Sequence, residues 1–526
     1  METSAISLIP PLIVILLVIF TRRVIISISA GIISGALILC SFQPEQAVKA
    51  IAGSALQIVY TDGIWNFDNI LLILFILGLG VLTAFIDKNG GTAGFAKWAE
   101  KRVKNAVGAQ LLAFVLGIII FIDDYFNALT VGEVSRSLTD RYKVSREKLA
   151  YIIDSTSAPV CSICPLSSWG AYIIALFAVI LPRTAAPLNQ FIATIPYNFY
   201  AIFSLAVVAF SALWNINLGR MNDTASIKES QDDTASGHEE HASDLVLPIG
   251  ILVVVSMGTM YITGRVFSGS WDIFQILQYA STYLALCAGC LTALLYTLYR
   301  YWHFHGTKLF STARAGIMKV AGATAALLFA WVLIDMIAKL QPGTFLSGLL
   351  VAYHISPQLL PCLLFIFSAV MALATGFSWG VFGIMLPISV QMASTLGLET
   401  TMLYCCLGAV LSGAVFGDHC SPISDTTILS STGAQCVHID HVISQMPYAL
   451  FSAAVAAVGF LAIGYTNSLG AAFAVQVLLL AAVTALIVAR RSHILERQRR
   501  SPAKRGLFPF PVSGRRSIRP KKWKNA

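Results

Sequence analysis

Residues 107–127 read VGAQLLAFVLGIIIFIDDYFN, an apolar stretch that ends in two neighbouring carboxylates. Val107–Ile122 would make about 24 Å of helix, less than the roughly 30 Å of a bilayer core. Lys and Arg residues flank the stretch on both sides, at 97–104 and at 136–148. Because such residues favour the cytoplasmic side, both ends are expected there. The sequence therefore predicts a re-entrant hairpin whose polar tip lies at mid-membrane, inside protein or against a wet cavity.

The composition places the whole chain in a membrane. Hydrophobic residues make up 57% of its 526 residues, and charged residues make up 12%, about half of the roughly 25% in soluble proteins. The mean hydropathy is +0.76. These values exclude a soluble enzyme, a secreted disulfide scaffold and a disordered regulator, and they favour an all-α polytopic membrane protein. Full spans are expected near residues 5–21, 24–42, 69–86, 149–181, 189–213, 245–262, 280–299, 320–338, 401–433, 448–466 and 468–489.

A second apolar stretch, residues 358–395, has the same form as the first. Its centre reads TGFSWG (375–380), and its flanks carry almost no Lys or Arg. This hairpin is therefore expected to enter the membrane from the outside.

The sequence also matches itself. When Pro159 is placed on Pro422, PVCSICPLSSWGA (159–171) and PISDTTILSSTGA (422–434) are identical at six of thirteen positions, where chance gives about one. Each match follows a hairpin, and the two copies begin in opposite directions. The sequence therefore predicts two inverted-topology repeats, each with a re-entrant hairpin and a broken transmembrane helix. Such repeats are typical of secondary transporters, whose sites lie near the midplane where helices are interrupted.

The domain organisation follows from the repeats and the charges. From Arg490 onward the chain holds thirteen Lys or Arg and one acid, so the +9 net charge belongs to this tail. The tail predicts a cytoplasmic anchor rather than nucleic-acid binding. The N-terminus is expected outside, with Arg22 and Arg23 inside, in a cytoplasmic (inner) membrane. The predicted parts are a first repeat at 1–214, a polar cytoplasmic linker at 215–244, a second repeat at 245–467, an additional span at 468–489 and a basic disordered tail at 490–526.

The cysteine and histidine patterns do not indicate a metal site. The ten cysteines are spread through apolar segments and are expected to act as small hydrophobic residues, without a zinc site. The sequence His438-Ile439-Asp440-His441 is expected at the membrane interface. His419 stands beside Asp418 and is expected either to titrate near neutral pH or to be an ordinary buried histidine.

Aspartates at membrane depth are the main functional signal. Each intramembrane acid costs at least about 2.5–3.5 kcal/mol on insertion scales, so it needs a partner, a proton or a cation. The broken spans add hydroxyl side chains, and Pro159 and Pro422 are expected to open the helices there. Freed carbonyls, hydroxyls and carboxylates together form a hard-oxygen cage for a small cation. The acids predicted at this depth are Asp123, Asp124, Asp154, Asp335, Asp418 and Asp425, of which Asp335 has the best claim to a structural role.

The candidate ion- and substrate-binding residues are most of these acids together with polar residues near them in the sequence. They lie on the two hairpin tips and in the two helix breaks. The set is Asp123, Asp124, Asn127, Thr130, Asp154, Ser155, Thr156, Ser157, Ser162, Thr375, Ser378, Asp418, His419, Ser421, Ser424, Asp425, Thr426 and Thr427.

Three motifs carry a family resemblance: FIDDYFNALTVG (121–132), IIDSTSAPVCSICPLSSWGA (152–171) and GDHCSPISDTTILSS (417–431). They resemble the NhaC-type sodium/proton antiporter family of the ion transporter superfamily, over roughly residues 5–490. The resemblance implies two inverted repeats and places the ion and substrate site at the first hairpin tip and the two helix breaks. It implies Na⁺/H⁺ exchange, although some relatives couple malate and lactate and some carry amino acids such as methionine. The basic tail is not part of the pattern.

The expected function is therefore secondary transport without enzyme activity. Free aspartate has a pKa of about 3.9, so a carboxyl that a proton or Na⁺ can occupy near pH 7 must be buried or beside a second carboxylate. Na⁺/H⁺ exchange is the first hypothesis, and Na⁺-coupled transport of an organic solute is the alternative. The sequence shows no obvious intramembrane Lys or Arg for an anionic solute, and no motif for a hydrolase. The expected partners are the lipid bilayer, a small cation and, in the alternative, a small organic solute, with no cofactor beyond transported Na⁺ and H⁺ and no nucleic acid; a homodimer stays open.

Overall fold

The structure is a computed structural model, and it describes residues 5–21, 23–61, 63–181, 186–218, 221, 241–272, 275–276, 279–305, 309–354 and 356–500. It divides into two units, Met1–Gln476 and Val477–Ala526. Apart from the two-residue strands β1 (Tyr60–Thr61) and β2 (Ile64–Trp65), which pair antiparallel, the described secondary structure is helical.

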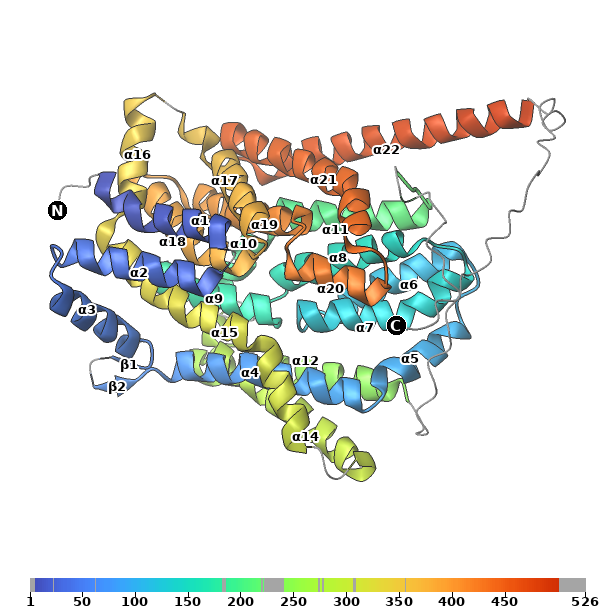
Figure 1. The fold of residues 1–526 in the computed structure, drawn as a ribbon, viewed down its shortest axis with the longest axis horizontal. Coiled ribbons are helices and arrows are strands. Elements are labelled where there is room, and N and C mark those ends of the chain that lie inside the picture. Colours follow the sequence, from blue (N-terminus) through green and yellow to red (C-terminus); the bar gives the residue numbers. More distant parts are fainter. Residues whose placement is uncertain are drawn as a thin grey trace, which may run out of the picture. The chain divides into compact units, whose positions relative to one another are not determined.

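The first half of the chain contains a pair of helices, a long helix, then a hairpin and a broken helix (Figure 1). Its helices are η1 (Ala5–Leu8), α1 (Ile9–Thr21), α2 (Val24–Leu39), α3 (Pro44–Gln57), α4 (Phe67–Lys88), α5 (Gly91–Glu100), α6 (Ala106–Ile119), α7 (Asp124–Arg141), α8 (Arg146–Ile163), α9 (Ser168–Ile180), α10 (Pro187–Thr194), η2 (Ile195–Tyr197) and α11 (Phe199–Leu213).

The second half repeats this order of elements. Its helices are α12 (Ser243–Ser268), α14 (Thr282–His305), α15 (Leu309–Leu340), α16 (Pro342–Ala352), η5 (Pro357–Leu359), α17 (Leu360–Thr375), α18 (Ser378–Thr395), α19 (Thr400–Cys420), α20 (Asp425–Ala434), α21 (His438–Thr466) and α22 (Leu469–Arg500). The predicted all-α fold, with two repeats that each hold a hairpin and a broken helix, is confirmed.

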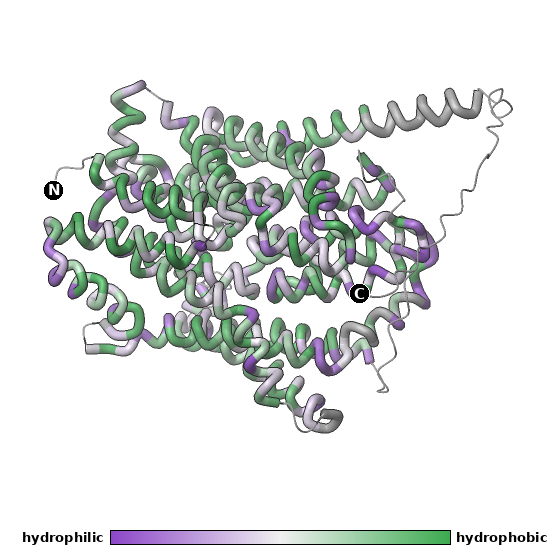
Figure 2. Tube along the Cα trace, in the orientation of Figure 1, coloured by the Kyte–Doolittle hydropathy of each residue, from purple (hydrophilic) through white to green (hydrophobic). Residues whose placement is uncertain are grey.

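Membrane-spanning helices are numerous within the described ranges. Nine are long and apolar enough to cross a bilayer, and the bent pair Pro187–Tyr197 and Phe199–Leu213 makes ten. Figure 2 shows that most of these helices are hydrophobic along their length. The spans expected at 5–21 and 24–42 are short, because η1 and α1 together cover only Ala5–Thr21 and α2 has 16 residues. At about 1.5 Å per residue neither covers a 30 Å bilayer core.

The two hairpins enter the fold from opposite ends. At one end Tyr142, which follows α7, donates a hydrogen bond to the carbonyl of Val103 before α6 (2.9 Å). At the other end Gln391 near the end of α18 accepts one from the Gly343 amide (2.9 Å). In Figure 1 α6 and α7 accordingly lie on the right and α17 and α18 on the left. The opposed hairpins are the core of the inverted repeat.

One of the two predicted helix breaks lies where it was expected, and the other does not. The second break is at Ser421–Ser424 and contains Pro422, as predicted. The first was expected at Pro159, but Pro159 lies inside α8 and the chain leaves the helix only at Cys164. A proline leaves the carbonyl four residues before it without its helical donor, and neighbouring groups can compensate this inside a membrane helix. The breaks therefore align Pro165, not Pro159, with Pro422.

The basic loops lie together at one end of the Met1–Gln476 unit. Asn89 donates to the Thr297 carbonyl (3.1 Å), and Arg300 pairs with Asp244 (2.9 Å). The spans expected at 280–299 and 320–338 leave residues 300–319 as a loop between them, which is wrong in part, because α15 begins at Leu309 and Lys319 is well inside that helix. Which end faces the cytoplasm stays a prediction.

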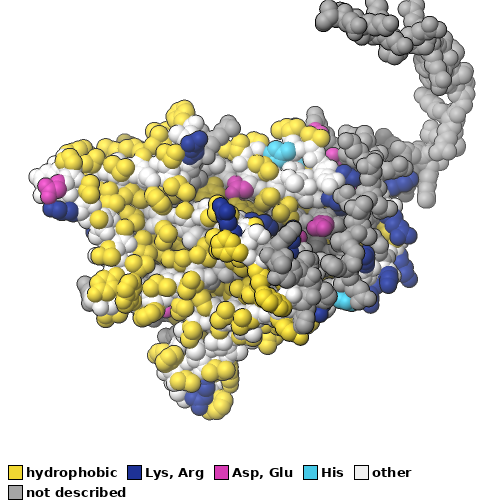
Figure 3. Space-filling view, turned by 60° about the horizontal axis from the view of Figure 1, so that its bottom comes forward, with side chains coloured by type: hydrophobic (Ala, Val, Ile, Leu, Met, Phe, Trp, Pro, Cys, Tyr) yellow, Lys and Arg dark blue, Asp and Glu magenta, His cyan; other side chains and the backbone are white. Residues whose placement is uncertain are grey.

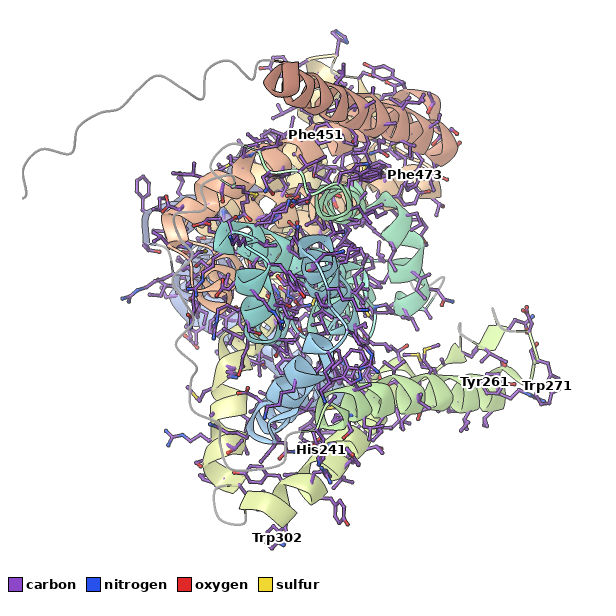
Figure 4. All side chains as sticks on the ribbon, turned by 90° about the vertical axis from the view of Figure 1, so that its right-hand side faces the viewer. His241, Tyr261, Trp271, Trp302, Phe451 and Phe473 are labelled. Atoms are coloured by element: carbon purple, nitrogen blue, oxygen red, sulfur yellow. The ribbon has the colours of Figure 1, made fainter. Side chains whose placement is uncertain are left out.

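Aromatic side chains mark both ends of the α12–α14 pair. Figure 4 shows Tyr261 and Trp271 toward one end of α12, and Trp302 near the far end of α14. Trp271 and Trp302 are exposed, and the Arg265 guanidinium carbon lies 4.1 Å from the centre of the Trp271 ring. Exposed aromatic residues at helix ends are typical of membrane–water interfaces.

The expected linker and tail are described only in part. The linker starts at residues 215–218, where the amide of Leu218 donates to Tyr448 Oη (2.7 Å), and it ends where α12 begins at Ser243. Residues 219–220 and 222–240 lie outside the described residues. The tail was expected to be disordered from residue 490, but α22 continues to Arg500. Residues 501–526 lie outside the described residues.

Candidate ion and substrate site

The first hairpin tip is attached to the first broken helix through Asp123. This residue caps α7, and its Oδ1 accepts a hydrogen bond from the Phe126 amide (3.1 Å). Its Oδ2 accepts one from Ser168 Oγ at the start of α9 (3.0 Å), and the Ser168 amide donates to the Ile122 carbonyl (2.9 Å). Asp124 is buried beside this junction. A carboxylate pair therefore lies at the tip, at the N-terminus of one helix half.

Asn127 and Thr130 have different roles from the acids. Asn127 Nδ2 donates to the carbonyls of Gly117 (2.6 Å) and Ile120 (2.8 Å), so it satisfies the end of α6 and closes the hairpin. Its Oδ1 has no hydrogen-bond partner among the described atoms. Thr130 is buried one turn further along α7. The structure thus places Asn127 at the tip and assigns its amide nitrogen to the backbone.

The second hairpin tip is attached to the second broken helix by the reverse arrangement. Ser378 Oγ, at the start of α18, donates to Asp418 Oδ2 on α19 (2.9 Å). Ser421 Oγ in the break donates to the Leu373 carbonyl (2.8 Å), and Thr375 Oγ1 accepts from the Phe377 amide (3.3 Å). Asp418 Oδ1 is buried without a hydrogen-bond partner among the described atoms.

The two repeats meet through Tyr125 and Asp425. Tyr125 Oη on α7 donates to Asp425 Oδ2 at the start of α20 (2.5 Å). Ser424 caps α20, and its hydroxyl lies 2.9 Å from that of Thr426. The Thr427 hydroxyl is buried without a partner among the described atoms. Tyr125 was absent from the sequence-based set, although it stands directly after the predicted acid pair.

Asp154 belongs to a second polar group, which we call the Asp154 group: Asp154, Ser155, Tyr200, His419, His441 and Gln445. Asp154 Oδ2 accepts from Gln445 Nε2 (2.9 Å) and lies 3.2 Å from His441 Nε2. His419 Nε2 is 3.7 Å from the same oxygen. These side chains come from α8, α11, α19 and α21, and none is on a hairpin.

His419 connects the rest of the Asp154 group. Its Nε2 lies 3.3 Å from Ser155 Oγ, and its Nδ1 lies 2.7 Å from Tyr200 Oη. His441 is fully buried and bonds Asp154, so it belongs to the Asp154 group. His438, three residues earlier, bonds the Pro422 carbonyl (2.7 Å) instead. The i, i+4 spacing of His441 and Gln445 on one helix face was the available signal for this part of the site.

Three predicted hydroxyls bond their own helix rather than a ligand site. Thr156 Oγ1 donates to the Ile152 carbonyl (2.7 Å), Ser157 Oγ to the Asp154 carbonyl (3.2 Å) and Ser162 Oγ to the Pro159 carbonyl (2.8 Å). These bonds are typical of Ser and Thr in apolar helices. Asp335 likewise has a structural role, because it pairs with Lys339 (2.6 Å) and Ser54 (2.5 Å).

A cavity of about 680 Å³ reaches the junction of the two repeats. Its wall includes the second hairpin tip, the second helix break, the bridging Tyr125–Asp425 pair and two basic residues. A separate cavity of about 10 Å³ touches Asp123, Asp124 and Ser168. The wall of the large cavity is formed by Arg23, Ile25, Ile26, Tyr125, Lys319, Gly322, Thr375, Gly376, Phe377, Pro422, Ile423, Asp425 and Ile428.

The acids of the junction have no salt bridge in the described part of the chain. Asp123, Asp418 and Asp425 hydrogen-bond only neutral donors in the contacts given above. Within the described ranges no three His, Cys, Asp or Glu side chains are grouped to hold a metal ion. The donor set is instead one of scattered carboxylate, hydroxyl and carbonyl oxygens at helix ends, which suits a transported hard cation.

The geometry agrees with the comparison with known proteins. The model of the Na⁺/H⁺ antiporter family matches residues 160–465, which is more than half of the chain. The chain belongs to the Na⁺/H⁺ antiporter family.

Relatives and one solved structure extend this assignment. An uncharacterized protein of Haemophilus influenzae is 42% identical to this family member over 490 residues, which are 90% of this chain and 93% of the relative. The malate-2H(+)/Na(+)-lactate antiporter of Bacillus subtilis is 30% identical over 130 residues, 23% of this chain and 27% of that protein.

The structure of the Alcanivorax borkumensis YdaH transporter is similar to 79% of this chain, with a TM-score of 0.55 and 14% identity, over 87% of that structure. This likeness concerns the fold alone. Together with the membrane spans, family membership makes the protein a multi-pass membrane transporter that lies in a lipid bilayer and moves small ions.

Proposed function

We propose that the protein exchanges Na⁺ for H⁺ across the cytoplasmic membrane, with the cation bound where the hairpin tips meet the helix breaks. The observation that carries this proposal is that Asp123 and Asp124 of the first hairpin tip converge with Asp418 and Asp425 of the second broken helix. These acids are largely buried and lack a basic partner among the described residues. Buried carboxylates of this kind need a proton or a metal cation to balance their charge.

Unpartnered oxygens support a cation at this junction. Asp418 Oδ1 and Thr427 Oγ1 are buried and accept no hydrogen bond in the described structure. The α19 helix ends at Cys420, so its last carbonyls are the negative end of a helix dipole. Carboxylate, hydroxyl and carbonyl oxygens are the ligands that small hard cations prefer. A proton at a carboxyl of the junction excludes the cation there, which is the competition that exchange requires.

The Asp154 group serves a different part of the cycle. Its carboxylate is held by His441 and Gln445 of α21, on helices that do not form hairpins. It therefore ties α8 of the first repeat to α19 and α21 of the second. Transporters with inverted repeats change access when one part moves against the other around a fixed site. We infer that this bonded group determines which of two arrangements of the repeats is stable.

A sodium-dependent proton flux tests the exchange. Purified protein in liposomes that trap a pH dye is given an outward proton gradient, and NaCl is then added outside. The proposal expects saturable alkalinisation of the lumen with NaCl and little with choline chloride. The absence of a sodium response in protein that is folded and inserted would refute the exchange.

A second candidate is Na⁺-coupled transport of an organic solute. The cavity of about 680 Å³ is far larger than a bare cation needs and lies within the roughly 300–1,000 Å³ of small-molecule sites. A relative that covers a quarter of this chain is named a malate-2H(+)/Na(+)-lactate antiporter. Uptake of labelled solutes in the same liposomes, with and without Na⁺, separates this candidate from simple exchange.

A further inference from the structure

Lys319 lies at the depth of the hairpin tips. It is ten residues, or about 15 Å, beyond the first residue of α15. The neighbouring Gly316 packs directly on the backbone of Gly80 in α4, which is eight residues, or about 12 Å, before the end of that helix. The next residue, Val320, shares the small cavity with Asp123 and Asp124. Lys319 is therefore an intramembrane lysine, which the sequence alone did not reveal.

Arg23 lies at a similar depth for a different reason. It connects α1 to α2, and both of these helices are too short to cross a bilayer. Arg23 lines the large cavity together with Thr375 and Gly376 of the hairpin tip and Pro422 of the helix break. The turn that the sequence placed at the cytoplasmic surface therefore lies level with the helix breaks.

Neither basic side chain is neutralised by contact. Both are exposed, and among the described residues neither forms a side-chain hydrogen bond or a salt bridge. Figure 3 shows basic and acidic side chains together near the middle of a largely hydrophobic face. A charged side chain at membrane depth costs about 2.5–3.5 kcal/mol on insertion scales, unless water or an opposite charge reaches it.

We propose that the large cavity binds a small organic carboxylate, with Lys319 and Arg23 as its cationic ligands. This inference deepens the proposed function and rests on it, because it adds a substrate to the same site. Arg and Lys are the side chains that bind carboxylates through charge-assisted hydrogen bonds. Apolar residues of the cavity wall, such as Ile25, Phe377 and Ile423, suit a short carbon skeleton.

An acid in the wall of the same cavity would couple the carboxylate to the cation. Asp425 lines the same cavity and is hydrogen-bonded by Tyr125. Its negative charge repels a bound carboxylate until a cation occupies the junction beside it. Na⁺ therefore raises the affinity for the carboxylate, and by reciprocity the carboxylate raises the affinity for Na⁺. The coupling expected for such linked sites is roughly 5–150-fold.

Binding to the purified full chain tests the proposal, with labelled L-malate and L-lactate as probes. The wild type should bind at least one of them, about tenfold more tightly in NaCl than in choline chloride, within the usual range of coupling. Lys319→Gln should weaken this binding about tenfold or more, and Lys319→Arg should restore most of it. Lys88→Gln is the matched control, because Lys88 is exposed and lines a neighbouring cavity with Lys319 but not this one.

Three results would overturn the carboxylate site. The first is that the wild type binds neither probe with Na⁺ present. The second is that Lys319→Gln, with a normal melting temperature, binds as the wild type does. The third is that Lys319→Gln weakens only the binding of an anionic phospholipid, measured in nanodiscs with and without phosphatidylglycerol, and not the binding of either carboxylate. Loss of Na⁺-driven proton flux in the wild type, with carboxylate binding intact, would instead refute the proposed exchange and leave this site standing.

Discussion

The two broken helices share one backbone design. In each, a proline stands directly after the residue that leaves the helix, and a serine two positions later caps the next half: Pro165 and Ser167 in the first, Pro422 and Ser424 in the second. A residue before proline avoids the helical region, and serine is a favoured cap. Local chemistry therefore produces the same break in both repeats.

The two breaks differ in where they carry charge. In the first repeat the acid is on the hairpin, where Asp123 accepts from Ser168 of the broken helix (3.0 Å). In the second repeat the acid is on the broken helix, where Asp418 accepts from Ser378 of the hairpin (2.9 Å). The scaffold is thus repeated while the charges are not. The comparison shows that the two repeats carry their acids on different elements of a similar frame.

The largest effect is expected at the acid of the second break. Asp418→Asn should lower Na⁺-driven proton flux by more than 100-fold, because the amide carries no charge for the cation while it still accepts from Ser378. A normal melting temperature shows that the variant is folded. Flux within threefold of wild type would contradict the assignment of Asp418 as the acid that holds the cation at the second break.

The acid pair of the first tip should respond unequally. Asp124 has no hydrogen bond among the contacts above, whereas Asp123 caps α7 and binds Ser168. Asp124→Asn should therefore reduce flux about tenfold or more. Asp123→Asn keeps a good cap and should move the pH profile of exchange toward acid pH, because a negative charge that favours protonation of Asp124 has gone. Stopped-flow flux between pH 6 and pH 9 measures both; equal effects of the two changes would contradict this division.

The bridge between the repeats should have a moderate effect. Tyr125→Phe removes the hydrogen bond to Asp425, and a hydrogen bond to a charged group contributes about 1.5–3 kcal/mol. The Na⁺ concentration for half-maximal flux should therefore change by roughly three- to tenfold, after discounting for water that replaces the hydroxyl. Tyr142→Phe is the control at the other end of α7, where the hydroxyl donates to the Val103 carbonyl. Equal responses of the two variants would show that the Tyr125–Asp425 hydrogen bond does not affect Na⁺ binding.

The smallest effect is expected from the C-terminal tail. Every residue of both polar groups lies in the Met1–Gln476 unit, so deletion of residues 501–526 should leave flux per inserted molecule within about twofold of wild type. The basic residues attract anionic lipid and can influence targeting. Quantitative immunoblotting of membranes separates targeting from flux, and loss of flux in inserted protein would contradict the prediction.

Much of the fold follows from the sequence, because hydropathy, basic flanks and short apolar stretches depend on local chemistry. The hairpins at 107–138 and 358–395 and the break at Pro422 are examples. The first break was misplaced because Pro159 was aligned with Pro422. Pro165 and Pro422 are each followed two positions later by a capping serine, whereas Pro159, which lies inside α8, is followed there by Cys161. Pro387 and Pro447 are likewise inside helices.

The site residues that sequence reasoning missed are those brought in by distant packing. His441 and Gln445 reach Asp154 across 287 and 291 residues of chain. Tyr125 finds Asp425 across 300 residues. In the sequence Lys319 lies just before an expected span, so it is taken for a loop residue, whereas α15 begins at Leu309. Local sequence patterns do not predict contacts between residues so far apart in the chain. The acids themselves could be predicted, because a carboxylate in an apolar membrane segment is energetically unfavourable without a function.

The most direct test of the account is equilibrium ²²Na⁺ binding to the purified protein, with proton release measured in the same sample. The account predicts saturable binding that weakens as the pH falls, with protons released when Na⁺ binds, and no saturable binding in Asp418→Asn. Wild-type affinity and proton release in folded Asp418→Asn would contradict it, because the cation would then be bound away from the junction of the two repeats.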